Sequence, residues 1–476
     1  MTPEGIGFAI LLLALLLLGG KLLRLRWRLP QKLFLPSSII AGLLALLLGP
    51  DVLGAAAERL GWDALGHGLW GESAFVVWEA LPELLISVVF ASLFLGHTIP
   101  RPREIWDRGG PQLSVGVTMG AGQYVVGMLL ALLVLTPLFG LNPLAGALIE
   151  IGFEGGHGTA AGLGETFEGL GFEEGEDLAL GLATIGLVAG VLFGVGLINW
   201  GARTGRTAFV SGQADQSRDQ QRGIFAADER PEGASMTVRP ESIEPLSIHC
   251  GLVGAAVLVG VALLEGLQAL EDTLWAPAGV EIIEHVPLFP LAMIGGLIVQ
   301  LLIQRFDRRD LVDRRMILRV QGIALDVLIV AALATLSLDV IGAFLAPFLM
   351  LAGAGIAWNL IVFLLLVPRM IPTYAFERGL TDFGQSMGVT ATGLVLLRVV
   401  DPQNESPAME SFGYKQLGFE PVLGGGLVTA LSMPLIAQVG PLAFLAIMAV
   451  VLAGALTLGL AYFGRQRART DAEVSA

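Results

Sequence analysis

The chain has 476 residues, 54% of them hydrophobic, and its mean hydropathy is +0.74. Soluble globular domains contain roughly 45–50% apolar residues, so these values exclude an ordinary soluble domain and indicate a protein with many membrane spans. The formal net charge of −14 argues against nucleic acid as a partner. The single cysteine, Cys250, excludes an intrachain disulfide and a cysteine-based metal site.

Apolar stretches of about 20 residues, the length that crosses the hydrocarbon core of a bilayer, recur along the chain. Backbone groups in lipid must be paired within the segment, so we expect helices. A β-barrel would need short segments that alternate in polarity. The predicted fold class is therefore an all-α polytopic membrane protein with about eleven transmembrane helices. The predicted spans lie near residues 5–22, 33–50, 75–97, 112–138, 177–201, 246–268, 286–304, 316–342, 344–367, 421–438 and 441–463.

Lysine and arginine residues gather at alternate ends of these spans, and such clusters mark the cytoplasmic side of a membrane. This rule places the N-terminus outside and the C-terminus in the cytoplasm. The clusters lie near residues 21–32, 101–108, 203–206, 305–319, 369–378 and 465–469.

The order of the spans divides the chain into two halves. Five spans precede a polar stretch that contains SGQADQSRDQQRG and DERPEGAS and is predicted to be a cytoplasmic linker. Because five is odd, the second half begins on the opposite side of the membrane and repeats the pattern inverted. The predicted division is an N-terminal repeat at 1–202, the linker at 203–245, an inverted C-terminal repeat at 246–440, and an extra helix with a tail at 441–476.

A short internal similarity supports the two repeats. MGAGQYVVGMLLALLV at 119–134 is similar to AGAGIAWNLIVFLLLV at 352–367, and each has Gly-Ala-Gly followed by an amide, Gln123 or Asn359. We expect both amides to be buried. Glycine-rich faces also occur in membrane helices simply because they allow close packing, so the Gly-Ala-Gly motif alone does not establish the repeat.

Each half also contains an apolar segment that is too interrupted to form an ordinary crossing helix. The first, at about 143–171, and the second, at about 376–397, are rich in glycine and carry acids and hydroxyls. Irregular backbone at membrane depth survives only when it is buried in protein or lines a watery cavity. Interrupted segments at matching positions of two halves indicate a transporter site. We therefore predict two opposed re-entrant hairpins, the first entering from outside and the second from inside.

The residues of these hairpins suggest binding of both an anion and a cation. Glycines let backbone amides approach a solute, and a half-helix that begins at Gly158 and Thr159 directs its positive end toward an anion. A carboxylate in a low-dielectric region needs compensation, so Na⁺ or a proton is a natural partner of Glu154. The predicted substrate-binding residues are Gly155, Gly156, His157, Gly158, Thr159, Gly384, Gln385, Ser386, Thr390 and Thr392. The predicted cation-coupling residues are Glu154, Asp382 and Glu150, with Na⁺ at Glu154 and Asp382.

Several of these residues also have a structural interpretation. The ring of His157 either binds substrate or shuttles a proton, or it only pins the loop by a hydrogen bond. Glu150 either binds the cation or lies on a wet loop face. Hydroxyls such as Thr390 and Thr392 often bond back to their own backbone in membrane helices.

The motif GGHGTAAG at 155–162, preceded by LNPLAG at 141–146 and followed by LATIGLVAGVLFG at 182–194, resembles the bacterial sodium/glutamate symporters. LPSSIIAGLLAL at 35–46 and the amide Gln123 support the resemblance. It implies a secondary transporter with inverted repeats that imports L-glutamate together with Na⁺ and needs no cofactor besides that ion. It also implies a homodimer with a mobile transport domain, located in the inner membrane of a bacterium.

The sequence departs from the family pattern in the second hairpin. FGQSMGVTATG at 383–393 has Ala391 where the family has proline, and Glu150 and Glu154 replace small or hydroxyl residues. These departures affect the identity of the substrate more than the class of mechanism. A proton-coupled carrier of another organic anion and a passive channel on the same scaffold are the alternatives. The chain has no G-x-x-x-x-G-K-[ST] motif, so ATP-driven transport is unsupported, and we do not expect an enzyme.

Overall fold

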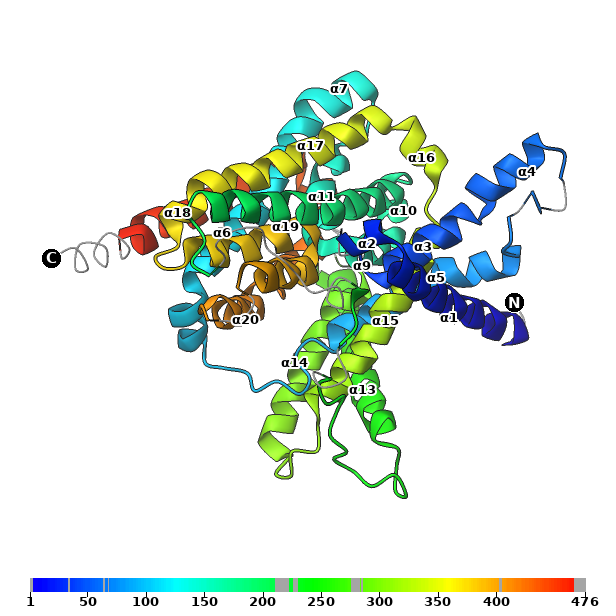
Figure 1. Cartoon of the computed structure of the whole chain (residues 1–476), viewed down its shortest axis with the longest axis horizontal. Coiled ribbons are helices and arrows are strands. Elements are labelled where there is room, and N and C mark those ends of the chain that lie inside the picture. Colours follow the sequence, from blue (N-terminus) through cyan, green and yellow to red (C-terminus); the bar gives the residue numbers. More distant parts are fainter. Residues whose placement is uncertain are drawn as a thin grey trace. The chain divides into compact units, whose positions relative to one another are not determined.

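The computed structural model describes residues 3–32, 35–62, 65–66, 68–209, 222–225, 230–274, 283, 286–401 and 405–465. The regular elements formed by these residues are all helices (Figure 1). Parts of two predicted segments lie outside the described residues, namely 210–221 and 226–229 of the linker and 466–476 of the C-terminal tail.

The chain forms two compact units, and each takes its helices from both sides of the linker. The first unit consists of Met1–Ile99, Ala161–Thr166 and Arg218–Val340. The second consists of Pro100–Ala160, Phe167–Ser217 and Ile341–Ala476. The division of the sequence into two inverted repeats remains a prediction.

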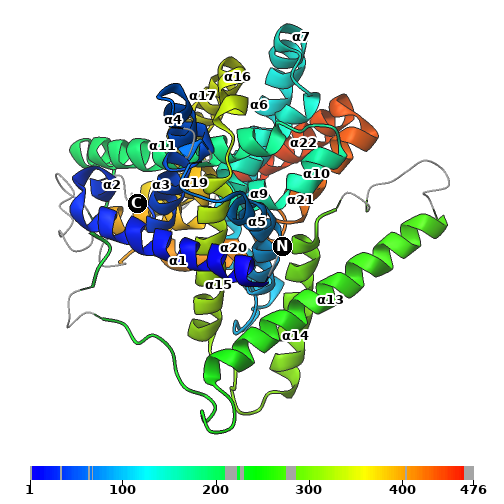
Figure 2. The ribbon, with the colours of Figure 1, turned by 90° about the vertical axis from the view of Figure 1, so that its right-hand side faces the viewer.

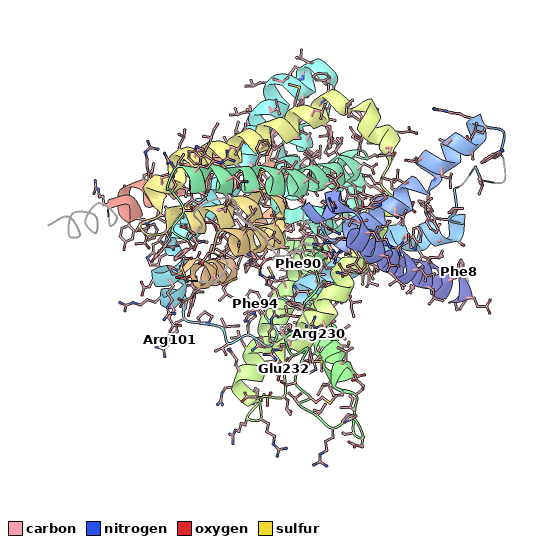
Figure 3. All side chains as sticks on the ribbon, in the orientation of Figure 1. Phe8, Phe90, Phe94, Arg101, Arg230 and Glu232 are labelled. Atoms are coloured by element: carbon pink, nitrogen blue, oxygen red, sulfur yellow. The ribbon has the colours of Figure 1, made fainter. Side chains whose placement is uncertain are left out.

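The first unit is built around α5, which packs against α14 and α15. The ring centroids of Phe90 and Phe289 lie 5.0 Å apart in its interior, whereas Phe8 projects outward from α1 (Figure 3). Figure 2 shows α13 extending alongside α14. The helices of this unit are α1 (Pro3–Arg26), α2 (Arg28–Lys32), α3 (Ser37–Leu47), η1 (Pro50–Gly54), α4 (Ala55–Arg59), α5 (Glu72–Ala91), α13 (Pro245–Leu274), α14 (Leu288–Phe306) and α15 (Arg314–Ala334).

The second unit is built around α6, α11 and α19, and α11 packs against both α17 and α19 (Figure 1). Its elements are α6 (Pro102–Leu130), η3 (Ala131–Leu135), α7 (Thr136–Phe139), η4 (Pro143–Ala147), α8 (Leu148–Glu150), η5 (Ile151–Gly155), α11 (Gly175–Arg203), α17 (Leu345–Ile361), η8 (Val362–Leu366), α18 (Val367–Met370), α19 (Ala375–Val400), α20 (Ala408–Phe419), α21 (Leu427–Val439), α22 (Pro441–Thr457) and η9 (Leu458–Phe463). Three short helices straddle the boundaries of the units: α9 (Gly156–Gly162), α10 (Gly164–Gly169) and α16 (Leu338–Ala343).

Eleven helical segments among the described residues are long and apolar enough to cross a membrane. All but one coincide with a predicted span, which confirms the prediction of an all-α, multi-pass membrane protein. The exception is α19, which contains the second interrupted segment.

The predicted span near 421–438 is longer than the helix that the structure contains. The apolar helix in this region, α21, has 13 residues, about 20 Å of helix, and a bilayer core is about 30 Å thick. The shortening has a local cause, because Gly424 and Gly425 have φ angles of 68° and 95°, outside the helical region. The helix α20 precedes them, in a stretch for which the sequence predicted no span.

Candidate functional site

The first interrupted segment breaks at Gly156. The turns η5 and α9 meet there, and Gly156 has a φ of 73° and a ψ of −170°, a combination that is almost restricted to glycine. Just before the break, Gly152 lies so close to α11 that an added Cβ would be 2.9 Å from the carbonyl oxygen of Ala179. The segment is therefore broken in the backbone and held against a long apolar helix.

The second interrupted segment reverses its direction inside α19. Val389 has a φ of 59° and a ψ of 174°, a strained conformation that costs on the order of 1–3 kcal/mol for a residue other than glycine. On either side of this break, an added Cβ at Gly384 would be 2.7 Å from Cα of Gly393. Nine residues of straight helix would separate these two by about 13 Å. The two halves of α19 consequently lie against each other, although re-entry into a membrane remains a prediction.

The two breaks meet. An added Cβ at Gly156 would lie only 2.4 Å from Cγ1 of Val389. Next to this contact, the Ser386 hydroxyl donates a hydrogen bond of 2.5 Å to Oε1 of Glu154. The sequence predicted that the two glycine-rich segments supply one site. The structure brings together the breaks of the two segments, at Gly156 and at Val389, within the second unit, and we call these breaks the tips of the segments.

Glu154 is the acid at this meeting point, and its side chain is 1% exposed. Only Oε1 is bonded, since Oε2 has no hydrogen-bond partner among the described residues. Oε2 faces α6, where an added Cβ at Gly120 would lie 2.9 Å from it. Two more buried oxygens, Oγ1 of Thr159 and Oε1 of Gln123, also have no hydrogen-bond partner within the part of the chain that the structure describes.

The predicted amides Gln123 and Asn359 lie together and hold the second tip. Nε2 of Gln123 donates to Oδ1 of Asn359 at 3.3 Å. Both amides also donate to the backbone carbonyl oxygen of Ser386, at 2.7 Å from Gln123 and 2.8 Å from Asn359. The two equivalent amides of the predicted repeat therefore converge on the residue that binds Glu154.

Asp382 has a partner that the sequence analysis did not identify. Its Oδ1 lies 3.3 Å from Nζ of Lys415 on α20, and both side chains are fully buried. The same ammonium group also donates a hydrogen bond to Oε1 of Gln385. Asp382 and Gln385 thus share one cation that comes from the protein itself.

Glu150 lies one turn before Glu154 but is fully bonded. Its Oε2 accepts a 2.5 Å hydrogen bond from the Tyr124 hydroxyl. Its Oε1 accepts hydrogen bonds from the Thr429 hydroxyl at 2.8 Å and from the Gly424 amide at 3.0 Å. The alternative of a wet loop face is wrong for this carboxylate, because it is completely buried.

The remaining predicted site residues have structural partners or lie beside the tips. Nε2 of His157 is 2.9 Å from Oγ1 of Thr184 on α11, and Thr392 donates to the carbonyl oxygen of Gly388 in its own segment. Thr390 accepts a hydrogen bond from Nε2 of Gln416 at 2.6 Å.

The predicted glycines of the first segment are packed beside its break. Gly155 packs on Thr159, since an added Cβ would lie 2.9 Å from Cβ of Thr159. Gly158 is buried in α9.

Lys415 was not among the predicted site residues, because no element was predicted between the second interrupted segment and the span near 421–438. A signal was present, since Phe412 and Phe419 stand three residues before and four residues after Lys415, the spacing of one helical face. In the structure Nζ of Lys415 lies 5.3 Å and 3.9 Å from the centroids of these two rings. A lysine between two aromatic residues at helical spacing would have indicated a buried ammonium group.

Comparison with known proteins identifies the family. A search of curated proteins finds no match. The family model described as sodium/glutamate symporter matches residues 79–372, more than half of the chain. This range includes the first interrupted segment and both buried amides. The chain therefore belongs to the sodium/glutamate symporter family, whose members are membrane transporters.

Proposed function

We propose that this protein imports L-glutamate, or a closely related small carboxylate, by symport with Na⁺, and that Glu154 binds the coupling ion. The protein lies in a bacterial inner membrane as a homodimer, with its N-terminus outside and its C-terminus in the cytoplasm. The observation that carries the proposal is the contact between the two broken segments, where a buried carboxylate is left with one free oxygen.

The chemistry of the free oxygens favours a monovalent cation. A buried carboxylate is costly unless a cation, a proton or hydrogen bonds compensate its charge. Glu154 contributes one such oxygen, and Thr159 and Gln123 contribute neutral oxygens that also lack partners. The described residues contain no group of three or more His, Cys, Asp or Glu side chains that would hold a metal ion. One negative charge among neutral oxygens matches the single charge of Na⁺.

The substrate anion is placed between the same tips. The backbone amides around Gly155–Thr159 and the side-chain amide of Gln385 supply hydrogen-bond donors for its carboxylates. The Ser386 hydroxyl, whose proton goes to Glu154, accepts a hydrogen bond from the ammonium group of the substrate. Ser386 donates a hydrogen bond to Glu154. A cation bound to Glu154 is therefore separated from the substrate by the Ser386 side chain alone. Binding of the ion and binding of the anion therefore favour each other through charge and through the shared hydroxyl.

The test measures uptake of labelled L-glutamate into proteoliposomes that contain the full-length protein. The gradients compared are inward Na⁺, inward protons at equal Na⁺, and choline in place of Na⁺. We expect uptake to be driven by the Na⁺ gradient. Stimulation by the proton gradient alone would show that the coupling ion at Glu154 is a proton and not Na⁺. Absence of glutamate uptake under every gradient would overturn the proposed substrate.

A second measurement separates a carrier from a channel. Vesicles are loaded with unlabelled glutamate and diluted into a trace of labelled glutamate, with Na⁺ equal on both sides. A carrier accumulates label transiently above its outside concentration by exchange, whereas a passive channel only equilibrates it. Failure to see this overshoot in vesicles that take up glutamate would favour the channel.

A further inference from the structure

Lys415 and Asp382 form an ion pair inside the second unit, with both side chains fully buried. The distance from Nζ to Oδ1 is 3.3 Å, and neither oxygen of Asp382 accepts a hydrogen bond of ordinary geometry from a residue that the structure describes. Arg378 stands one turn earlier on α19, and its Nε donates to Oε1 of Gln112. Its charge interacts with Asp382 only from beyond ion-pair distance. Among the described residues, Lys415 is the cation within ion-pair distance of Asp382.

This pair lies next to the cation site proposed at Glu154. On α6, an added Cβ at Gly116 would lie 2.9 Å from Nζ of Lys415, and one at Gly120 would lie 2.9 Å from Oε2 of Glu154. Positions four residues apart on a helix are neighbours on one face, about 6 Å apart. The ammonium group and the free carboxylate oxygen are therefore adjacent along α6.

Along α19, as along α6, the residues that contact Lys415 come before the residue that contacts Glu154. Asp382 and Gln385 contact Lys415, and Ser386 contacts Glu154. Spacings of three and four residues place these side chains on one face of the helix. Two buried carboxylates therefore lie next to each other. Asp382 is paired with a cation of the protein, whereas Glu154 has one hydrogen bond and no cation within ion-pair distance among the described residues.

We propose that Lys415 is a built-in counter-cation that occupies the place of a second coupling ion at Asp382. Under this proposal, which rests on the proposed Na⁺ symport, Glu154 binds Na⁺ during transport and Asp382 does not. A buried carboxylate that loses its cation must recruit another one or be neutralised by a proton. Removing the ammonium group consequently turns Asp382 into an additional Na⁺ site.

The experiment compares three forms of the full-length protein in proteoliposomes: the wild type, Lys415→Gln, and the double variant Asp382→Asn with Lys415→Gln. Fluxes of ²²Na⁺ and labelled glutamate are measured together at alkaline pH, where protons are scarce. We expect Lys415→Gln to transport about one more Na⁺ per glutamate than the wild type, because one unpaired carboxylate binds one monovalent ion. The double variant has no unpaired carboxylate and is expected to return to the wild-type ratio.

An unchanged Na⁺:glutamate ratio in Lys415→Gln would overturn the inference, and so would an increased ratio that persists in the double variant. Wild-type protein without Na⁺-driven uptake would instead reject the proposed function itself. The two failures are therefore distinguished by which protein shows them.

The single variant Asp382→Asn gives an independent readout if Lys415→Gln does not fold. In this variant the ammonium group loses its only carboxylate within ion-pair distance among the described residues and keeps the hydrogen bond to Gln385, so it can compete with Na⁺ for the adjacent oxygen of Glu154. We expect the Na⁺ concentration at half-maximal uptake to rise at least about tenfold, with glutamate exchange at saturating Na⁺ retained. An unchanged half-maximal concentration would show that the pair is only structural and would overturn the inference.

Discussion

Glu150 and Glu154 lie one turn apart in the same broken segment, and both are almost completely buried. Glu150 receives hydrogen bonds from Tyr124, Thr429 and the Gly424 amide. Glu154 receives a hydrogen bond from Ser386 and keeps Oε2 without a partner. Two identical side chains in one segment thus differ in how their negative charge is compensated. Three donors bind Glu150, whereas a single donor binds Glu154. Burial alone therefore does not distinguish the two acids, whereas the hydrogen-bond partners of their oxygens do.

The difference follows from what each carboxylate faces. Glu150 faces α6 and the segment around α21, which supply two hydroxyls and an amide, so its charge is compensated by the protein. Glu154 faces the glycine surface of α6, where Gly120 has no side chain to offer. We interpret Glu150 as a clamp that ties α21 to the first interrupted segment, and Glu154 as the position for an ion.

The largest expected effect comes from Glu154→Gln. The amide oxygen still accepts the hydrogen bond from Ser386, so the fold should persist, but the negative charge that attracts the cation is gone. We expect Na⁺-stimulated glutamate uptake to fall at least about tenfold, which corresponds to roughly 1.4 kcal/mol or more of lost coupling free energy. Uptake into proteoliposomes under an inward Na⁺ gradient measures this loss.

The matched control is Glu168→Gln, because Glu168 is an exposed acid close by in sequence. This control should retain the Na⁺ dependence of the wild type. If Glu154→Gln retained it as well, the coupling ion would bind elsewhere and the contrast between the two buried acids would lose its functional meaning.

The second effect concerns the break that positions Glu154. Gly156→Ala places a methyl group 2.4 Å from Val389 and forces alanine into a backbone conformation that costs on the order of 1–3 kcal/mol. We expect glutamate uptake to fall several-fold and the thermal unfolding temperature of the purified protein to decrease. Gly353→Ala on α17 is the control, since an added Cβ there meets nothing within 4 Å. Equal uptake in both variants would show that the meeting of the tips is dispensable.

The third effect concerns Glu150, the fully bonded acid of the pair. Glu150→Gln removes the charge that three donors bind, so it should destabilise the protein by about 1–3 kcal/mol without changing the Na⁺ concentration at half-maximal uptake. Unfolding in detergent, followed with and without Na⁺, measures the first quantity, and the uptake assay measures the second. A shift in Na⁺ dependence with unchanged stability would reverse the roles assigned to the two acids.

Much of the fold was predictable because bilayer thickness constrains apolar length so strongly. The long helices and both broken segments follow from hydropathy and from glycine at positions such as Gly156, which needs its backbone conformation. The internal repeat indicated that Gln123 and Asn359 are buried amides, although it did not indicate that they contact each other or bind one carbonyl oxygen. Hydropathy overestimated the span near 421–438, because it does not register the φ angles of Gly424 and Gly425.

The partners of the buried acids were not predictable from local sequence. Glu150, Glu154 and Asp382 all read as intramembrane acids, and their differences depend on residues far away in the chain. Lys415 lies between the second interrupted segment and the span near 421–438, where the sequence predicted no element. Only the tertiary structure shows which acid already has a cation, so the sequence supported Na⁺ at Asp382 and at Glu154 equally.

The smallest expected effect concerns His157, which resembles Glu150 in having a partner within the protein. Its Nε2 lies 2.9 Å from Oγ1 of Thr184. Thr184→Val keeps the volume of the side chain and removes this partner, which should lower stability by about 1 kcal/mol and change Na⁺-driven uptake less than threefold. Thermal unfolding and uptake of the same preparation measure both quantities. If uptake were lost while stability was retained, the orientation of the His157 ring would be required for substrate binding. A side chain of this segment that already has a hydrogen-bond partner would then have a functional role.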